Sequence, residues 1–458
     1  MTLYRPPAPV PTTPVRGLVR AMLSGERDLL SLLPDIAYTT AVGKLGRSRR
    51  GILLVNEPAA VARVLTDAHG EFPKNDLMVG ALEGLVGQSI FVSSGAAWRR
   101  QRRMVEPAFS QLRIDRAFDA IAGGVDAYEA TLDDHAARGA RFSLDAAMSA
   151  LTADIICRTI FSQSLASQTA RDVFSSFAQF ERSVANTEIR RLLFGRPFAE
   201  IPQSAPVRQA CARIRGHIGD LLDPRLAKDA AVIDDIVGSV IAARDPATGD
   251  RFTREELIDQ IGVFFLAGHE TTASVLTWIF FILSQQPQTA AAMRHEVQRV
   301  AGHGPIRLEH TKQMGFIRNV FRETMRLYPP ITFIPRVAAR DTEIAGHRVP
   351  RGCMVMIAPW TVHRSPANWA DADRFDPHRF DQQRLSGEIA PGAYIPFGLG
   401  PRICVGAAFA TIESTLILAR LVRRYDFTPD DPSSVRPVAR LTTKPAREIT
   451  VLARRCPA

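Results

Sequence analysis

The stretch PFGLGPRICVGAAF at 396–409 presents one cysteine between a turn-rich loop and an apolar segment. Gly398, Gly400 and Pro401 disfavour a helix before Cys404, whereas the residues after it favour one. The cysteine is therefore expected near a helix N-terminus, where free backbone N–H groups and the positive end of the helix dipole favour a thiolate. A thiolate at such a position suits a metal, which is the first hypothesis for this chain.

The hexapeptide AGHETT interrupts an otherwise apolar helical segment with polar groups. Gly268 weakens the helix, Thr271 can donate its hydroxyl proton to a backbone carbonyl, and Glu270 is costly to bury without a partner or a function. Two interpretations carry about equal weight: a kink with a satisfied buried carboxylate, or a proton-relay pair beside a reactive centre. His269 should point away from the face that carries Ala267 and Thr271, so it is treated as structural.

Two further patterns place charge at helical spacing. In WRRQRRMVEPAFS, Trp98 and Arg102 share one face of a short helix that Pro107 disrupts, and both can donate hydrogen bonds to anionic groups. In FIRNVFRETMRLY, Glu323 and Arg326 lie at i,i+3 before a double proline. Taken alone, the pattern of Trp98 and Arg102 favours a solvated basic helix with a packed tryptophan. A solvent-exposed ion pair at the spacing of Glu323 and Arg326 would stabilise its helix by only about 0.3 kcal/mol.

The composition indicates a globular chain with a large core. Of 458 residues, 46% are hydrophobic and 23% are charged, which excludes a mainly disordered chain. The five cysteines are scattered, which excludes a zinc or disulfide framework and favours a reducing cytoplasm. The net charge of +10 is spread along the chain, which argues against nucleic acid as a partner. The most apolar segment, 261–283, contains polar residues and is expected to be a core helix, so no integral membrane contact is expected.

The expected elements are a small sheet and many helices. The sheet material comes from 38–55 and from several short strands within 331–366, which are expected to pair with each other. One helix opens at Pro58, and another opens at a capping box around Thr253 and continues to about Gln286. The remaining helical expectations are a patch near 18–33 and amphipathic helices over 112–245 with breaks near 195–206 and 221–226. Residues 73–92 are expected to be a loop with possible helical turns that is able to cover a pocket, and 441–455 a C-terminal hairpin.

Together, the order and spacing of these motifs resemble the cytochrome P-450 family of haem-thiolate enzymes along nearly the whole chain. The family's F-x-x-G-x-R-x-C-x-G loop is matched at every defined position, by Phe397, Gly400, Arg402, Cys404 and Gly406. AGHETT matches the family's oxygen-activation motif, and the charged pair before the double proline matches its helical E-x-x-R. The arginine of the family's P-E-R-F region is present as Arg379, while His378 replaces the glutamate.

The resemblance implies a fold that is mainly α with a smaller β region. In that fold, haem b lies between the long central helix and the cysteine-ligand loop with its helix. A single catalytic domain over 17–458 would follow a proline-rich lead over 1–16. The residues that would hold the haem are Trp98, Arg102, Ala267, Arg336, Phe397, Gly398, Arg402, Cys404 and Gly406.

The resemblance also gives these residues roles. Cys404 would ligate the iron, and Phe397 would shield its sulfur. The side chains that would neutralise the two haem propionates are Trp98, Arg102, Arg336 and Arg402. For Trp98 and Arg102, this role replaces the interpretation as a solvated basic helix. A buried charge triad would hold the ligand loop, and the loss of one member would cost haem and fold together. Its members would be Glu323, Arg326 and Arg379.

The implied activity is that of a monooxygenase, which activates O2 and inserts one oxygen atom into a hydrophobic small molecule. Glu270 and Thr271 would deliver the protons. The expected pocket residues are nearly all apolar, which favours a terpenoid, a fatty acyl chain or an aromatic compound: Ile90, Phe91, Val263, Phe264, Ile331, Thr332 and Phe333. The acid–alcohol pair argues against two alternatives, a peroxygenase that uses hydrogen peroxide and a non-catalytic haem sensor or binding protein.

The implied electron source is a separate protein. The chain after Cys404 is too short for a flavin or ferredoxin domain, which needs about 100 residues. We therefore expect a ferredoxin or flavodoxin with its reductase as partner. Arginine clusters at 99–103 and 420–424 offer basic faces on which an acidic partner could dock, and the first is favoured. A cytoplasmic monomer is expected.

Overall fold

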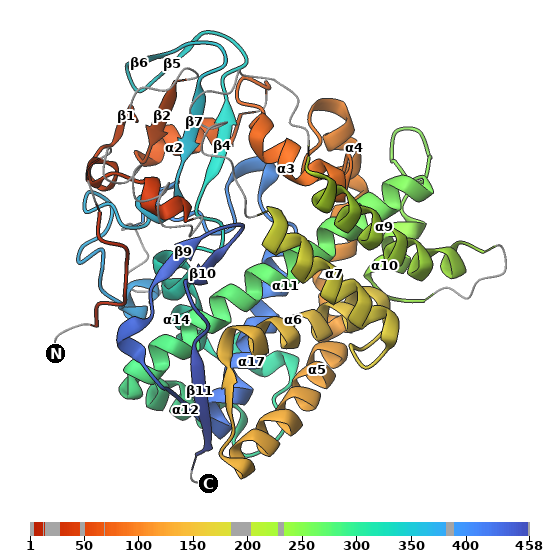
Figure 1. Cartoon of the computed structure of the whole chain (residues 1–458), viewed down its shortest axis with the longest axis vertical. Helices are drawn as coiled ribbons and strands as arrows, with labels where there is room; N and C mark the ends of the chain where they lie inside the picture. Colours follow the sequence, from red (N-terminus) through yellow and green to blue (C-terminus); the bar gives the residue numbers. More distant parts are fainter. Residues whose placement is uncertain are drawn as a thin grey trace.

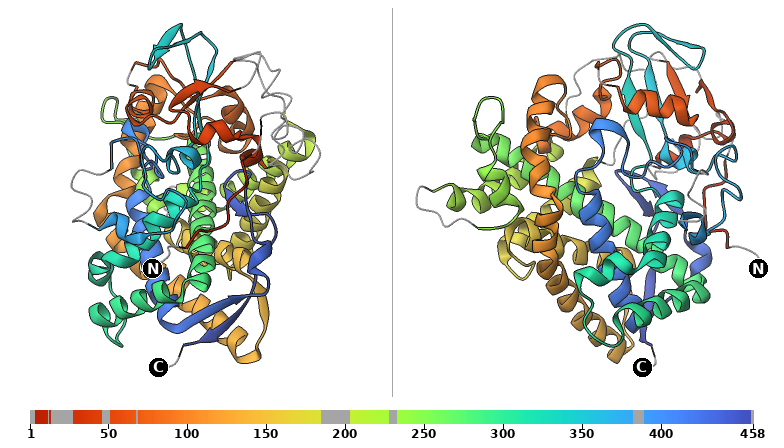
Figure 2. Two further views of the ribbon diagram at one scale, coloured as in Figure 1. Left: turned by 90° about the vertical axis from the view of Figure 1, so that its left-hand side faces the viewer. Right: turned by 180° about the vertical axis from the view of Figure 1, so that it is seen from behind.

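The computed structural model has helices through most of the molecule and a small sheet at one end (Figure 1, Figure 2). The residues that it describes are 4–11, 13, 28–45, 51–67, 69–184, 203–227, 233–381 and 389–456. The fold class is the expected one, mainly α with a smaller β region. The expected boundary between lead and domain, at 16/17, lies outside the described residues, as does most of the helical patch near 18–33.

The long helix α11 (Arg254–Gln285) runs through the centre of the molecule (Figure 1). It begins with the predicted capping box, in which Glu256 N donates to Thr253 Oγ1 and Thr253 N donates to Glu256 Oε2. Almost every side chain from 257 to 283 is buried, which is typical of a helix inside a large core. Among the described residues, α11 is the one helix long and apolar enough to cross a membrane, and its burial shows a core helix, as predicted.

The other helices surround α11. Those before it are α2 (Pro58–Leu65), α3 (Asp76–Val86), α4 (Gly95–Val105), α5 (Gln111–Arg138), α6 (Leu144–Phe161), α7 (Gln168–Val184), α9 (Ala205–Leu226) and α10 (Ile236–Ala242). Those after it are α12 (Pro287–Ala301), α13 (Leu308–Gln313), α14 (Gly315–Leu327), α15 (Pro359–Val362) and α17 (Ala407–Arg424). The helices α6, α9, α14 and α17 pack directly against α11, and α5 packs against both α6 and α17.

A four-stranded sheet has the order β1-β2-β7-β4. Its strands are β1 (Val42–Lys44), β2 (Ile52–Val55), β7 (Met354–Ile357) and β4 (Ile334–Val337). The central pair, β2 and β7, is parallel and places Leu53 opposite Val355, whereas the two outer pairs are antiparallel. This confirms the predicted pairing between 38–55 and 331–366. The helix α2, which begins at Pro58 as predicted, packs Val61 and Val64 into the same apolar core as β2.

The predicted C-terminal hairpin over 441–455 is wrong. The strands there are β10 (Thr443–Pro445) and β11 (Thr450–Arg455), and β10 pairs instead with β9 (Pro437–Ala439). The strand β11 pairs on one edge with β8 (Tyr425–Pro429) and on the other with β3 (Arg141–Ser143). Two partners satisfy both backbone edges of β11, which a two-stranded hairpin would not do. The remaining strands, β5 (Thr342–Ile344) and β6 (His347–Val349), form a hairpin.

Two helices extend where the sequence predicted a loop or a break. Residues 76–86 form α3, because the burial of Leu82, Leu85 and Val86 against neighbouring helices outweighs the low helix propensity of two glycines. The helix α9 continues through Pro224 and ends at Leu226, so the predicted break near 221–226 is the last turn of a helix. The other predicted break, near 195–206, lies mostly outside the described residues.

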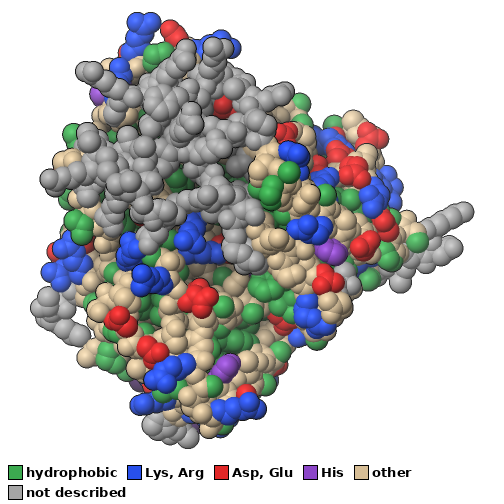
Figure 3. Space-filling view, viewed as in Figure 1, with side chains coloured by type: hydrophobic (Ala, Val, Ile, Leu, Met, Phe, Trp, Pro, Cys, Tyr) green, Lys and Arg blue, Asp and Glu red, His purple; other side chains and the backbone are tan. Residues whose placement is uncertain are grey.

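The two arginine clusters are not free basic faces. On α17, Arg420 and Arg424 bind the buried carboxylate of Glu129 on α5, and Arg420 also binds Asp126. In the cluster at 99–103, three of the four arginines pair with carboxylates: Arg100 with Glu256, Arg102 with Glu106, and Arg103 with Asp245. The face shown in Figure 3 also carries basic and acidic side chains in mixture. Most of the positive charge in both clusters is therefore neutralised within the molecule.

We predict that Glu129→Gln lowers the free energy of unfolding by about 3 kcal/mol, because two arginines lose their buried counterion. Asp126→Asn is the control, since it removes a partner of the same Arg420. The Asp126 side chain is 63% exposed, and its loss should cost less than about 1 kcal/mol. Urea unfolding followed by circular dichroism measures both variants. Equal effects of the two substitutions would contradict the importance given to Glu129.

Candidate active site

The loop that presents Cys404 depends on glycine backbone geometry. Gly398 and Gly400 have φ angles of 77° and 73°, in the left-handed region that favours glycine. A Cβ on Gly400 would lie 2.7 Å from the carbonyl oxygen of Leu65 at the end of α2, so a side chain does not fit there. Cys404 N donates to Phe397 O at 3.0 Å and closes the loop. The backbone therefore fixes the position of the cysteine.

The surroundings of Cys404 act on its thiol in opposite directions. Burial raises the pKa of Cys404, while the N–H of Gly406 and the guanidinium of Arg102 lower it by a smaller amount. Gly406 is the N-cap of α17, as expected for a cysteine near a helix N-terminus. The Cys404 side chain is exposed in this structure, and the preformed thiolate stays a prediction.

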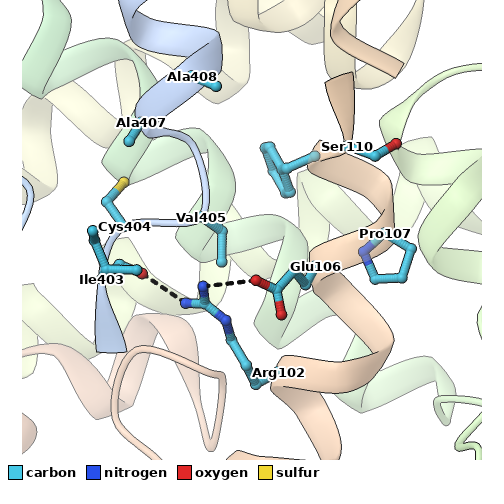
Figure 4. Close-up of a pocket in the computed structure, with 10 residues that line it drawn as sticks. Arg102, Glu106, Pro107, Ser110, Ile403, Cys404, Val405, Ala407 and Ala408 are labelled. Carbon is cyan, nitrogen blue, oxygen red and sulfur yellow. Dashed lines mark hydrogen bonds and ion pairs between the residues drawn. The ribbon is translucent and has the colours of Figure 1, made fainter. Parts of the chain in front are cut away.

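A cavity of about 480 Å³ opens beside Cys404 (Figure 4). Its lining residues are Arg102, Glu106, Pro107, Phe109, Ser110, Ile403, Cys404, Val405, Ala407 and Ala408. Arg102 joins two walls, since its Nη1 donates to Ile403 O at 2.7 Å and its Nη2 lies 3.2 Å from Glu106 Oε1. In Figure 4 the sulfur of Cys404 points toward Ala407. A second cavity of about 360 Å³, lined in part by α14, shares the start of α17 with the first.

Three neighbouring positions on α11 are open within its buried segment. Ala267 is exposed and Gly268 and Thr271 are partly exposed, although the side chains before and after them are buried. Thr271 Oγ1 donates to Ala267 O at 2.7 Å, and the helix is continuous here. His269 packs its ring against Phe265 and away from this opening, with Nδ1 2.9 Å from Phe265 O. These three positions leave one face of α11 open within an otherwise buried helix.

Glu270 is buried, with 2% of its surface exposed, and has polar partners. Thr442 Oγ1 donates to Glu270 Oε1 at 2.8 Å, and Lys444 of β10 forms an ion pair with the same oxygen. The Lys444 side chain is 34% exposed, so it joins the buried carboxylate to solvent. Sequence reasoning missed Lys444, because a single lysine in a C-terminal strand gives no signal of its neighbour on α11. The structure thus shows a buried Glu270 carboxylate whose charge is compensated, as one of the two interpretations of AGHETT expected. The contact with the partly exposed Lys444 also leaves room for a proton relay.

Three cations converge near Trp98. Arg402 lies over the Trp98 ring at 4.4 Å and donates to Ser93 O at 3.1 Å, while its Nη1 has no hydrogen-bond partner among the described residues. Burial lowers the pKa of Arg402 to about 10. Burial, with a further contribution from Arg402, lowers the pKa of Arg336 to about 10. Burial and both arginines hold the pKa of Lys74 well below its ordinary value.

This cluster of like charges has the sign and position to bind a dianion. Within the described part of the chain, no carboxylate forms an ion pair with Lys74, Arg336 or Arg402. Like charges in surroundings of low polarity repel each other, and two carboxylates placed among them would relieve that repulsion. The two propionates of a haem have the required charge. Sequence reasoning missed Lys74, which follows directly on a proline and stands in a segment predicted as a loop.

Glu323, Arg326 and Arg379 come together in the arrangement that the resemblance implied. Arg326 Nε and Nη2 donate to the two oxygens of Glu323 at 2.7 and 2.8 Å, and Arg379 Nε donates to Glu323 Oε1 at 3.3 Å. Neither Glu323 nor Arg326 has any exposed surface. The remaining N–H groups of Arg326 donate to backbone carbonyls within 363–374. Both buried charges are thus fully hydrogen-bonded.

His363 joins this triad to the ligand loop. Arg326 Nη1 donates to the backbone oxygen of His363 at 2.8 Å, and Ile395 N donates to the His363 ring at Nε2, also at 2.8 Å. Burial lowers the pKa of His363 to about 3, with smaller contributions from Arg326 and Arg364. The ring is therefore neutral at pH 7, and Nε2 can accept. Since Ile395 stands just before Phe397, the triad fixes the entry to the ligand loop.

The residues expected at the substrate pocket do not line either cavity beside Cys404. Val263, Phe264 and Thr332 are buried, and the others are partly buried: Ile90, Phe91, Ile331 and Phe333. The Phe264 ring packs edge-on against Phe109, which lines the larger cavity, with ring centroids 5.3 Å apart. The Phe91 ring lies 4.5 Å from Lys74 Nζ. Phe264 and Phe91 therefore contact residues of the candidate site, namely Phe109 and Lys74.

Comparisons with known proteins identify the family. The family model described as cytochrome P-450 matches residues 39–452. Cyclooctatin synthase of Streptomyces melanosporofaciens is 31% identical over 443 residues, which cover 93% of each chain. Pentalenene oxygenase of Streptomyces avermitilis is 28% identical over 394 residues, which cover 86% of this chain and 85% of the relative. A crystal structure of a cytochrome P-450 haem domain has a TM-score of 0.81 over 99% of each chain at 22% identity, which shows a shared fold.

The match extends along nearly the whole chain and includes the cysteine loop, the central helix and the charge triad. The sequence identity to the first Streptomyces relative is spread over almost the full length of both proteins. With Cys404 as the cysteine of the matched loop, this chain belongs to the cytochrome P-450 family of haem-thiolate monooxygenases.

Proposed function

We propose that this monooxygenase hydroxylates or epoxidises a terpenoid or a similarly apolar small molecule. The residues expected at the pocket support this, because Thr332 alone among them is polar. Two Streptomyces relatives, whose names refer to cyclooctatin and pentalenene, support the terpenoid class. The observation that carries the proposal is the opening at Ala267, Gly268 and Thr271 in an otherwise buried helix of a protein whose cysteine loop is intact.

The proposed cofactor site uses the cysteine loop, α11 and the three converging cations. Cys404 would ligate the haem iron, and Lys74, Arg336 and Arg402 would neutralise the propionates with Trp98 beside them. Phe397 and Gly398 would enclose the sulfur, while Ala267 and Gly406 would leave room for the macrocycle. Arg102 was also expected at a propionate, but it donates to Ile403 O and pairs with Glu106, so we propose that it holds the loop instead. When bound, haem supplies O2 binding and oxygen insertion, and the protein supplies the ligand, the protons and a dry pocket.

Glu270 and Thr271 are proposed to move protons to the oxygen side of the site. The hydroxyl of Thr271 faces the opening in α11 and can donate toward it by turning away from Ala267 O. The carboxylate of Glu270 is held by Lys444, which is partly exposed and can pass on a proton taken from solvent. Protons would then travel from Lys444 to Glu270 and on to Thr271.

The family's reaction requires a redox partner, which we propose is a ferredoxin or flavodoxin with its reductase. The proposed docking face lies on the ligand-loop side of the molecule. There, Arg99 and Arg322 have no carboxylate partner among the described residues, and Arg322 lines the second cavity. We further propose a single catalytic domain over 17–458 and a monomer that works in the cytoplasm.

The acid–alcohol pair favours O2 as oxidant over the two alternative functions. A peroxygenase that takes hydrogen peroxide receives its protons with the oxidant, and a haem sensor needs no proton path. Neither alternative would require Glu270 and Thr271 beside an opening in the central helix. The partly exposed Lys444 behind Glu270 adds a solvent connection that both alternatives leave unused.

The substrate class can be tested by the shift of the ferric haem spectrum from low spin to high spin. We expect cyclic terpenes to produce the shift at lower concentrations than fatty acids of equal carbon number, because the described cation in contact with a pocket position, Lys74 at Phe91, is the one proposed to bind a haem propionate. Terpenes converted to carboxylic acids serve as the charged control. A shift produced by fatty acids and not by terpenes would refute the proposed class.

We predict that Lys74→Met increases the rate of haem loss about tenfold, since one charge-assisted contact to a propionate disappears. The same substitution should raise the stability of the haem-free protein, because it removes one of three repelling charges. Transfer of haem to apomyoglobin and urea unfolding of the haem-free chain measure the two effects. Lys312→Met, at an exposed position, is the control. Destabilisation of the haem-free protein by Lys74→Met would contradict the cation cluster.

We predict that Thr271→Ala lowers the product formed per electron about tenfold, because the proton path loses its last hydroxyl. Electron consumption should continue and yield peroxide or water. Thr277→Ala is the matched control, since Thr277 makes the same hydroxyl bond to a carbonyl one turn back on α11, at 2.8 Å, within the buried part of the helix. Coupling equal to that of the wild type in Thr271→Ala would rule out the proposed relay.

A further inference from the structure

The turn between α3 and α4 is fastened to two consecutive residues of α11. Gln88 N donates to Asp259 Oδ2 at 3.0 Å, and Ile90 N donates to Gln260 Oε1 at 3.1 Å. Arg215 of α9 binds the other oxygen of Asp259, with 2.6 Å between Nη1 and Oδ1. The Asp259 carboxylate thereby joins three elements, and the turn has a fixed position on the central helix.

The side-chain amide of Gln260 is satisfied at one end only. Because its Oε1 accepts from Ile90, the other end is the NH2 group, which can donate two hydrogen bonds. Gln260 has no exposed surface, and its Nε2 has no hydrogen-bond partner among the described residues. A buried donor without a partner is costly, and native proteins rarely keep one. The NH2 group is therefore suited to bind an acceptor that the chain itself does not supply.

A second buried polar group lies in the same turn. Ser89 stands between the two fastened residues and has no exposed surface, and its Oγ has no hydrogen-bond partner in the described part of the chain. The backbone of Ser89 is in use, because its N donates to Val86 O at 3.1 Å and its O accepts from the N–H groups of Val92 and Ser93. The main chain is thus fixed, while the hydroxyl remains able to bind.

Helical spacing places Gln260 on the face of α11 that carries the opening. Ala267 and Thr271 follow Gln260 by seven and eleven residues, which puts all three on one face of the helix. Phe264, an expected pocket position, stands four residues after Gln260 on that face, and Ile90 is another expected pocket position. Eleven residues rise about 16 Å along a helix axis. The amide therefore lies at the end of the proposed pocket that is remote from the oxygen site.

We propose that Gln260 is a specificity-determining residue whose NH2 group donates a hydrogen bond to an uncharged oxygen of the substrate, a ketone or a hydroxyl, remote from the carbon that is oxidised. The inference rests on the proposed function and narrows it, from an apolar terpenoid to a terpenoid that already carries one oxygen. The Ser89 hydroxyl would offer a second hydrogen bond to that oxygen. A carboxylate is disfavoured, because Asp259 adjoins Gln260 and its partner Arg215 is already paired.

The test compares a cyclic diterpene hydrocarbon with a set of ketones of the same ring skeleton, by the shift of ferric haem from low spin to high spin. In the wild type we expect the tightest ketone to have a dissociation constant about tenfold below that of the hydrocarbon, as one hydrogen bond to a buried donor gives. In Gln260→Met the ratio should fall to about one, because a thioether cannot donate. A displaced turn would weaken both kinds of probe, so the ratio isolates the amide.

Gln101→Met is the matched control. Gln101 is a buried amide of the same region with both ends in use, since its Oε1 accepts from Ser93 Oγ and its Nε2 donates to Gln88 O, each at 2.6 Å. This variant should weaken the binding of both kinds of probe and keep the ratio between them. The thiolate-type carbon monoxide spectrum checks that each variant is folded.

The infrared carbonyl band of the bound ketone gives a second measurement that needs no variant. In the wild type it should lie at a lower frequency than in hexane, because a hydrogen bond weakens the carbonyl. A ketone that binds the wild type no more tightly than the hydrocarbon, or a ratio that stays tenfold in Gln260→Met, would overturn the proposal and leave water as the partner of the amide. If no terpene of either kind shifts the spectrum, the proposed terpenoid class itself fails and this inference fails with it.

Discussion

The ion pair between Glu323 and Arg326 is the constraint on which the haem site depends. Both residues are fully buried, and charges in such a place are tolerated only when every polar atom has a partner. Arg326 meets this requirement by using its guanidinium N–H groups on Glu323 and on carbonyls of the segment that precedes the ligand loop. The segment is therefore held by the same bonds that make the buried charges acceptable. His363 extends the arrangement to the loop itself.

The same logic divides the buried charges of this protein into two groups. In the first, which includes the triad and the Glu129 network, charges are compensated within the chain and stabilise it in the absence of any cofactor. In the second, formed by Lys74, Arg336 and Arg402, no described carboxylate forms an ion pair with the cations, although Asp67 acts on Arg336 from a greater distance. The second group is where, under the proposed assignment, the haem propionates would contribute to the stability of the folded state.

The sequence was sufficient for the features that are local in the chain. The capping box at Thr253, the core character of α11 and the hydroxyl bond of Thr271 follow from neighbouring residues and their helical spacing. The pairing of β2 with β7 followed from the strand-like patterns of 38–55 and 331–366. Features that depend on distant partners were missed. Nothing near Lys444 shows that it meets Glu270, and nothing near Lys74 shows that two arginines lie beside it.

The segment 76–86 shows the same limit in packing. Its glycines and its lack of a clean period predicted a loop with possible helical turns, yet burial against α9 and α11 makes a full helix, because tertiary contacts outweigh a propensity difference of about 1 kcal/mol per glycine. The decisive contribution comes from elements far along the chain.

The three clustered cations would have a consequence for how the protein accumulates in a cell. If the haem propionates bind them as proposed, haem stabilises the folded state by mass action, so the folded population would rise with the concentration of free haem. Each tenfold increase in free haem above its dissociation constant adds about 1.4 kcal/mol to the folded state. Haem supply would then set the amount of intact enzyme as well as its activity. A shortage would be met first by loss of the protein through unfolding and degradation.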